Sequence, residues 1–328
     1  MSDHHEPHHF AHEPVLLAEV LELFTPVPAG AVVDATVGGG GHAAALLELR
    51  SDLRLVGIDR DDDALAAASA RLGRFGERVR LVHARFDELG AVLDELGAGP
   101  LSGALFDLGA SSPQLDRPER GFSLRFDGPL DMRMDRTAAL TAADVVNTYP
   151  PERLAALFRD LGDEPPRLAA RLARAVVAAR PLRSTAQLAS VVAAATPAAA
   201  HRRGHPATRV FQAVRIEVNG ELDALPGALD AALERLAPGG RLVALAYHSG
   251  EDRIVKERLR RAETGGCVCP PRLPCVCGAR PLVRLVRRGA GKASPAEVGA
   301  NPRSASVRLR AAERLPADPP AAAEAARP

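Results

Sequence analysis

Short apolar runs alternate with helical stretches over the first hundred residues. The runs are short and mainly apolar, most of them closed by an acid, which is typical of strands in a parallel sheet covered on both faces. They lie at 31–34, 53–59, 79–87 and 101–107. The third range includes the loop after the strand. Apolar residues at helical spacing separate them, at 42–49, 61–72 and 88–96. This alternation predicts an α/β fold, preceded by a helix over 12–24.

The pattern changes after the fourth predicted strand. A polar loop with little periodicity is followed by helical stretches at 151–161, 166–180 and 185–195, and a loop of this length inside a domain is usually functional. We interpret residues 113–215 as a helical insertion between the fourth and fifth strands.

The sheet resumes after this insertion. A helix is expected to run on through 216–225, and a fifth strand is expected at 241–248. Segments 281–287 and 304–310 predict a closing antiparallel pair. The sheet domain then comprises residues 1–112 and 216–312, and the Pro- and Ala-rich residues 313–328 are predicted to be a disordered tail.

Four consecutive glycines, Gly38 to Gly41, join the first strand to its helix. Strand, glycine turn and helix form the opening unit of nucleotide-binding α/β domains. Gly38, Gly40 and Ala43 fit the pattern G-x-G-x-x-A, so NAD is one interpretation. Asp34 favours S-adenosylmethionine (SAM), because an acid there pairs with the amino group of a methionine moiety but fits poorly beside a pyrophosphate. A tight structural turn is the simplest alternative.

Three of the predicted strands end in an acid: Asp34, Asp59 and Asp107. The carboxyl ends of parallel strands form the ligand-binding edge of open α/β sheets. Asp59 is placed to bind the two ribose hydroxyls of an adenosine, a role that fits NAD and SAM equally, while Asp61 is the natural cap of the next helix. Phe86 is placed to flank an adenine, or else belongs to the core.

Charge is unevenly distributed although the formal net charge is +1. Residues 1–112 have a net charge of −10, 113–215 of +6 and 253–310 of +11. Basic segments on an acidic scaffold suggest a polyanionic partner, and solvated surfaces are the alternative. Segment 201–215 contains Arg202, Arg203, Arg209 and Arg215 and no acid, which makes it a candidate phosphate-contacting surface.

All four cysteines lie in one short segment, as Cys267, Cys269, Cys275 and Cys277. Four thiolates this close could hold one tetrahedral zinc ion, although zinc sites usually have C-x-x-C rather than C-x-C pairs. A loop of reduced cysteines is the alternative. The sequence contains no apolar run long enough to span a bilayer and no signal peptide, so we expect a cytoplasmic protein without a membrane partner.

Eight motifs in order along residues 12–310 together resemble a known family. The most specific is Asp-Leu-Gly-Ala-Ser-Ser-Pro-Gln-Leu-Asp at 107–116, where agreement by chance is negligible. The others are 12–17, 34–42, 57–61, 120–123, 127–135, 205–215 and 248–256. The chain resembles the bacterial 16S rRNA cytosine-N4 methyltransferases of the MraW (RsmH) type.

This resemblance implies a Rossmann-like SAM-dependent methyltransferase sheet with a helical insertion that recognises RNA. It implies SAM contacts at Gly40, Gly41, His42, Asp59, Phe86, Asp107 and Gln114. Asp34 and Gly38 are further candidate SAM contacts, which the strand and glycine pattern indicates without the resemblance. The implied substrate is a cytosine in the decoding region of 16S rRNA, within the small ribosomal subunit or its late precursor. A homodimer is compatible with the family. Gly250 departs from its usual Leu, and the cysteine-rich loop occurs in some members only.

The implied reaction needs a group that orients the cytosine amine and takes its proton. Asp107 is the first choice, and Ser111, Ser112 and His248 are the second. Two other functional classes stay open. One is an NAD-dependent oxidoreductase, favoured by the glycine spacing. The other is a catalytically silent RNA-binding assembly factor, against which the intact Asp34, Asp59 and Asp107 argue.

Overall fold

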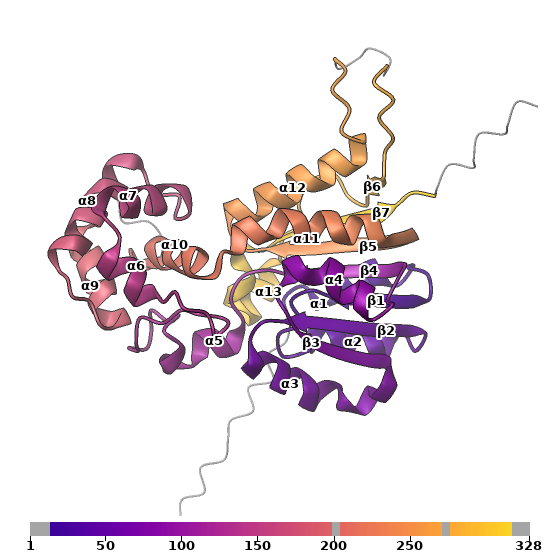
Figure 1. Cartoon of the computed structure of the whole chain (residues 1–328), viewed down its shortest axis with the longest axis horizontal. Helices are drawn as coiled ribbons and strands as arrows, with labels where there is room; N and C mark the ends of the chain where they lie inside the picture. The colour runs from indigo at the N-terminus through magenta and orange to yellow at the C-terminus, as the bar shows by residue number, and fades with distance from the viewer. Residues whose placement is uncertain (1–13, 199–203, 271–275, 317–328) are drawn as a thin grey trace, which may run out of the picture.

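The computed structural model describes residues 14–198, 204–270 and 276–316, and its centre is a seven-stranded sheet (Figure 1). The strand order is β3-β2-β1-β4-β5-β7-β6. The strands are β1 (Gly30–Asp34), β2 (Leu53–Asp59), β3 (Val79–His83), β4 (Leu101–Asp107), β5 (Leu236–Ala246), β6 (Val283–Leu285) and β7 (Arg308–Arg314). The predicted α/β fold class is confirmed, and β2 and β4 have their predicted bounds.

The strand order reverses between β1 and β4. Strands β1 to β5 are parallel, whereas β7 pairs antiparallel with both β5 and β6. In open α/β sheets, ligands bind outside the carboxyl ends of the strands at such a reversal. The fold therefore directs attention to the ends of β1 and β4, at Asp34 and Asp107.

Helices cover both faces of the sheet. One core packs α1 (Leu17–Phe24), α2 (Gly41–Leu49) and α3 (Asp62–Leu72) on one face. The other core packs α4 (Leu89–Glu95), α11 (Glu221–Arg235) and α12 (Ser249–Thr264) on the opposite face. Strands with apolar residues on both sides require exactly this kind of cover, because each face must be removed from water.

The insertion has a hydrophobic core of its own and lies to one side of the sheet (Figure 1). Its helices are α5 (Ser112–Asp116), α6 (Ala142–Thr148), α7 (Pro151–Asp160), α8 (Pro166–Ala178), α9 (Thr185–Ala195) and α10 (Thr208–Asn219). The predicted boundary at residue 215 falls inside α10, whose Val218 still belongs to this core. The predicted continuous helix through 225 is wrong, because Gly220 adopts a left-handed conformation (φ 59°) between α10 and α11.

The end of the chain also differs from the prediction. Strand β5 begins at Leu236 and ends at Ala246, so it starts and ends earlier than the predicted 241–248. The closing pair is antiparallel as predicted, but β7 lies at 308–314 and separates β6 from β5. Because Glu313 of β7 forms ion pairs with Arg241 and Arg284, the predicted tail boundary at 313 is too early. Residues 317–328 lie outside the described residues.

The remaining elements are short. They are α13 (Pro295–Ala300) and the 3-10 turns η1 (Gly73–Arg78), η2 (Phe86–Glu88), η3 (Pro118–Arg120) and η5 (Pro302–Ser306). Across 14–198, 204–270 and 276–316, no helix combines the length and the apolar character needed to cross a bilayer.

Candidate active site

The glycine loop lies against the end of β2. The Gly38 N–H donates to Asp59 Oδ2 at 2.9 Å, and Val37 N–H donates to the Ile58 carbonyl at the same distance. Gly40 has φ 74° at the start of α2, and a Cβ there would be 3.1 Å from the Leu72 side chain. The loop thus needs glycine for its backbone conformation and for its close packing on α3.

Asp34 is buried at the end of β1, with a relative exposure of 2%. Burial raises its pKa to about 8, and the carboxylates of Asp107 and Asp59 add to the rise, against a hydrogen bond from Thr36 N–H that lowers it. A carboxyl group with this pKa holds a proton at neutral pH until a cation approaches.

Asp107 is oriented by side chains from three other segments. Its Oδ1 accepts the Tyr247 hydroxyl at 2.7 Å, and its Oδ2 lies 3.5 Å from His42 Nδ1. Its backbone N–H donates to Thr36 Oγ1 at 2.6 Å. The side chain is nonetheless 28% exposed, so it is positioned precisely and is accessible to a substrate. Tyr247 was missed in the sequence, although it lies next to His248.

His42 and Asp59 both have partners inside the protein. His42 Nε2 lies 3.0 Å from the Val15 carbonyl oxygen, which ties α2 to the segment before α1. Asp59 accepts the Asp61 N–H at 3.0 Å as well as the Gly38 N–H, and burial raises the pKa of Asp59. Phe86 is half-buried in η2 and packs against the core of the α4 face.

Gln114 takes part in a buried hydrogen-bond network. Its Nε2 donates to Asp61 Oδ2 at 2.7 Å, and its Oε1 accepts the Ser111 N–H at 2.9 Å. Arg120 joins this network with bonds of 3.2 and 2.8 Å to the two Asp61 oxygens, and it also binds Asp63. Asp61 caps α3 as predicted, but sequence reasoning missed Arg120, although it lies in the Arg-Gly-Phe-Ser motif at 120–123.

The second-choice catalytic residues have different placements. His248 caps α12, and its ring pairs with buried Glu251 at 3.2 Å. Burial acts to raise the pKa of Glu251, but the bond and charge of His248, with the charge of Arg215, outweigh it and lower that pKa. The Ser111 hydroxyl is buried with no hydrogen-bond partner among the described residues. Ser112 is the first residue of α5, and its side chain is not among those that the structure describes.

The four candidate RNA-contacting arginines separate into three cases. Arg202 and Arg203 lie outside the described residues. Arg209 is half-buried on α10 and donates to the Asp163 carbonyl at 2.6 Å. Arg215 differs because its charge is already neutralised by a buried acid: its guanidinium makes bonds of 2.9 and 3.1 Å with Glu221. We therefore remove Arg215 from the RNA-contacting set.

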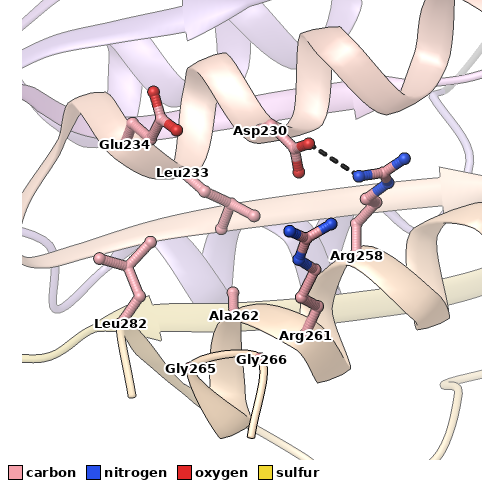
Figure 2. Close-up of a pocket in the computed structure, with 9 residues that line it drawn as sticks. All are labelled: Asp230, Leu233, Glu234, Arg258, Arg261, Ala262, Gly265, Gly266 and Leu282. Atoms are coloured by element: carbon pink, nitrogen blue, oxygen red, sulfur yellow. Dashed lines mark hydrogen bonds and ion pairs between the residues drawn. The ribbon is translucent and has the colours of Figure 1, made fainter. Parts of the chain in front are cut away.

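A hollow of about 380 Å³ lies between the C-terminal ends of α11 and α12 (Figure 2). Both helices run antiparallel to β5, so this hollow lies at the amino end of the strands, away from Asp34 and Asp107. Asp230 and Arg258 of its lining form an ion pair of 2.9 Å. It is not the place where the three strand-end acids meet.

The chain matches known proteins over almost its whole length. The model of the MraW methylase family matches residues 9–315. The chain belongs to the MraW methylase family. A protein named ribosomal RNA small subunit methyltransferase H, from Thermobifida fusca (strain YX), is 54% identical, covering 93% of each chain. One of the same name from Frankia alni is 55% identical, covering 94% of this chain and 96% of that protein.

Among solved structures, an rRNA methylase from Streptococcus thermophilus has 14% identity and a TM-score of 0.41, covering 91% of this chain and 95% of its own. The assignment to the methyltransferases depends on the family match. The family match favours SAM over NAD as the ligand of the glycine loop, because a methylase needs a methyl donor.

Proposed function

We propose that this chain transfers the methyl group of SAM to the N4 amine of a cytosine in the decoding region of 16S rRNA. The observation that carries the proposal is Asp107. It ends β4 at the reversal of strand order, it is oriented by Tyr247 and His42, and it is accessible. The family and the relatives named for small-subunit rRNA methylation support the same reaction.

The proposed SAM site follows the carboxyl edge of β1, β2 and β4. Asp34 pairs with the amino group of the methionine moiety, and the loop Gly38, Gly40, Gly41 with His42 lies along the cofactor. Asp59 binds the ribose, Phe86 flanks the adenine, and Gln114 supports the site from the Asp61 network. An ammonium group next to Asp34 stabilises its ionised form, so SAM binding releases the proton that burial holds there.

Methyl transfer breaks the sulfonium carbon–sulfur bond and forms a carbon–nitrogen bond to the cytosine amine. The amine is a weak nucleophile because its lone pair is delocalised into the ring, so in-line alignment supplies much of the acceleration. The Asp107 carboxylate accepts a hydrogen bond from the amine and takes its proton as the bond forms. The products are N4-methylcytidine and the thioether of the cofactor.

The target base must be unstacked before it can reach Asp107. We propose that the insertion, through Arg209 and the neighbouring Arg202 and Arg203, binds the RNA backbone while the base enters the edge of the sheet. A structured target favours the assembled small subunit or a late precursor as substrate, in the cytoplasm.

The test transfers labelled methyl from SAM to small subunits isolated from cells lacking this enzyme, and identifies the modified nucleoside by mass spectrometry. We expect N4-methylcytidine at one site. Asp107→Ala should reduce the rate by at least about 100-fold, while Asp94→Ala, an exposed acid on α4, should not. SAM binding without transfer would indicate the silent assembly factor instead, and near-normal turnover by Asp107→Ala would remove Asp107 from the mechanism.

A further inference from the structure

Three cysteine sulfurs converge in the loop that follows α12. The Sγ atoms of Cys267, Cys269 and Cys277 all lie within 4.8 Å of one another, and those of Cys267 and Cys277 are 3.7 Å apart. Zinc–sulfur bonds of about 2.3 Å in tetrahedral geometry set sulfurs about 3.8 Å apart, whereas a disulfide bond is about 2.05 Å long. The separation of Cys267 and Cys277 is too long for a disulfide bond, and it matches both a thiol–thiol hydrogen bond and two ligands of one metal ion.

The loop has little else to hold its shape. Its described residues, 265–270 and 276–282, form no helix or strand. The middle residues of the two C-x-C pairs, Val268 and Val276, are 86% and 89% exposed. Cys267 and Cys269 are partly buried and Cys277 is exposed, so no apolar side chain of these pairs is packed to hold the loop together. The cysteine cluster is thus the place where this loop is organised.

The two legs of the loop are also joined at its base. The Leu282 N–H donates to the Ala262 carbonyl at 2.8 Å. Gly265 (φ 62°) lies so close to the other leg that a Cβ would be 2.3 Å from the Arg280 carbonyl oxygen. Figure 2 shows Gly265, Gly266 and Leu282 together at this base, and Figure 1 shows the loop standing out from α12 and β6.

One hydrogen bond connects the two legs of the loop at the cysteine cluster. The Val276 N–H donates to Cys269 Sγ at 3.4 Å, across the two C-x-C pairs. Hydrogen bonds from backbone N–H groups to metal-bound sulfurs are a common outer-shell feature, because they stabilise the negative charge on sulfur. Cys267 and Cys269 on one leg of the loop and Cys277 on the other therefore bring three sulfurs together.

We propose that Cys267, Cys269 and Cys277 bind a structural zinc ion that fixes this loop on the ends of α12 and β6. Thiolates favour zinc over magnesium or calcium, since soft sulfur ligands match it. Cys275 lies outside the described residues, and the proposed site is built from the three described thiols. The proposal is independent of the methyl-transfer reaction, since the site is on a loop away from Asp107.

The test measures zinc in the full-length chain, purified without chelator, by elemental mass spectrometry. We expect about one zinc ion per chain bound by cysteine. Cys267→Ser and Cys277→Ser should each lose most of it, while Val268→Ser, in the same loop, should retain it. Replacing zinc by cobalt in the wild-type chain should give a sulfur-to-cobalt charge-transfer band, which histidine ligands do not produce.

The five histidines at residues 4–12 are a second place where zinc can bind, so the readouts must separate the two sources. Zinc that persists undiminished in both cysteine variants, with no charge-transfer band, would overturn the proposal. A metal-free protein with a disulfide between these cysteines would also overturn it. Circular dichroism of each variant checks that the fold is intact, and the cobalt band of the wild-type chain gives a decision if a variant does not fold.

Discussion

Two carboxyl groups at the candidate site, Asp34 and Asp107, are prepared in opposite ways. Asp34 is buried and its pKa is raised to about 8, so it holds a proton. Asp107 is accessible and accepts the Tyr247 hydroxyl at 2.7 Å. Asp34 is suited to bind an ammonium group, because a buried acid ionises when a cation approaches. Asp107 is suited to accept a proton, because it is accessible and fixed in orientation.

The Asp34 pKa predicts a pH-dependent stability in the absence of cofactor. The unfolded carboxyl titrates near 3.8 and the folded one near 8, so between these values unfolding releases a proton and stability falls as pH rises. From about pH 5.5 to about pH 7.5, this group should cost about 1–3 kcal/mol in the free energy of unfolding. Urea unfolding at both pH values should reveal this loss in wild type and its absence in Asp34→Asn.

The control for this measurement is Asp94→Asn, which changes an exposed acid. It should show the same pH dependence as the wild-type chain. If Asp34→Asn also followed the wild-type curve, Asp34 would be ionised in the folded protein, and the proposed proton release on SAM binding would fail.

At the scale of elements, the junction of β1 with α2 depends on Gly40. Gly40→Ala should destabilise the protein by more than about 1 kcal/mol, because alanine is strained at φ 74° and its Cβ meets Leu72. It should also weaken SAM binding by calorimetry. Gly73→Ala is the matched control, since it has φ −53° and no atom within 4 Å of the added Cβ. Equal stability of the two variants would show that the loop tolerates a side chain.

Elements buried on both faces were predictable from sequence, because a run such as 101–107 has one stable placement, in the middle of a covered sheet. The position of Asp34, Asp59 and Asp107 at one edge of the sheet was predictable too, because each ends a predicted parallel strand. The break at Gly220 was missed, because the apolar spacing of α10 continues into α11. Tyr247 and Arg120 were missed for another reason: their partners, Asp107 and Asp61, are distant in sequence, and periodicity carries no information on such contacts.

At the scale of the whole molecule, the insertion and the sheet are joined through a buried ion pair. The Arg120 side chain is 1% exposed and binds Asp61, which caps α3, and the carbonyls of Arg133 and Met134. The chain returns from the insertion to the sheet domain between α10 and α11. Two contacts lie there: Arg215 binds Glu221, and Arg60 donates to the Asn219 carbonyl. The helices of the insertion and the edge of the sheet are thus linked at two separate points.

Arg120→Met should lower the free energy of unfolding by about 3–5 kcal/mol, because it leaves buried Asp61 without its cation. Asp61→Asn in the same chain should recover part of this loss, and a double-mutant cycle by urea unfolding measures the coupling. Arg117→Met is the control, since Arg117 is half exposed and pairs with Asp63 at the surface. Additive effects of the two core substitutions would show that the pair does not join the two parts.

The position of the insertion has a consequence for the order in which the protein is made. Strands β1 to β4 leave the ribosome first, and the whole insertion follows before β5 appears. During that interval β4 is an edge strand, although its side chains up to Phe106 are buried in the finished sheet. An unpaired apolar edge is a site of aggregation. The β4 edge therefore stays unpaired throughout the synthesis of the insertion, until β5 pairs with it.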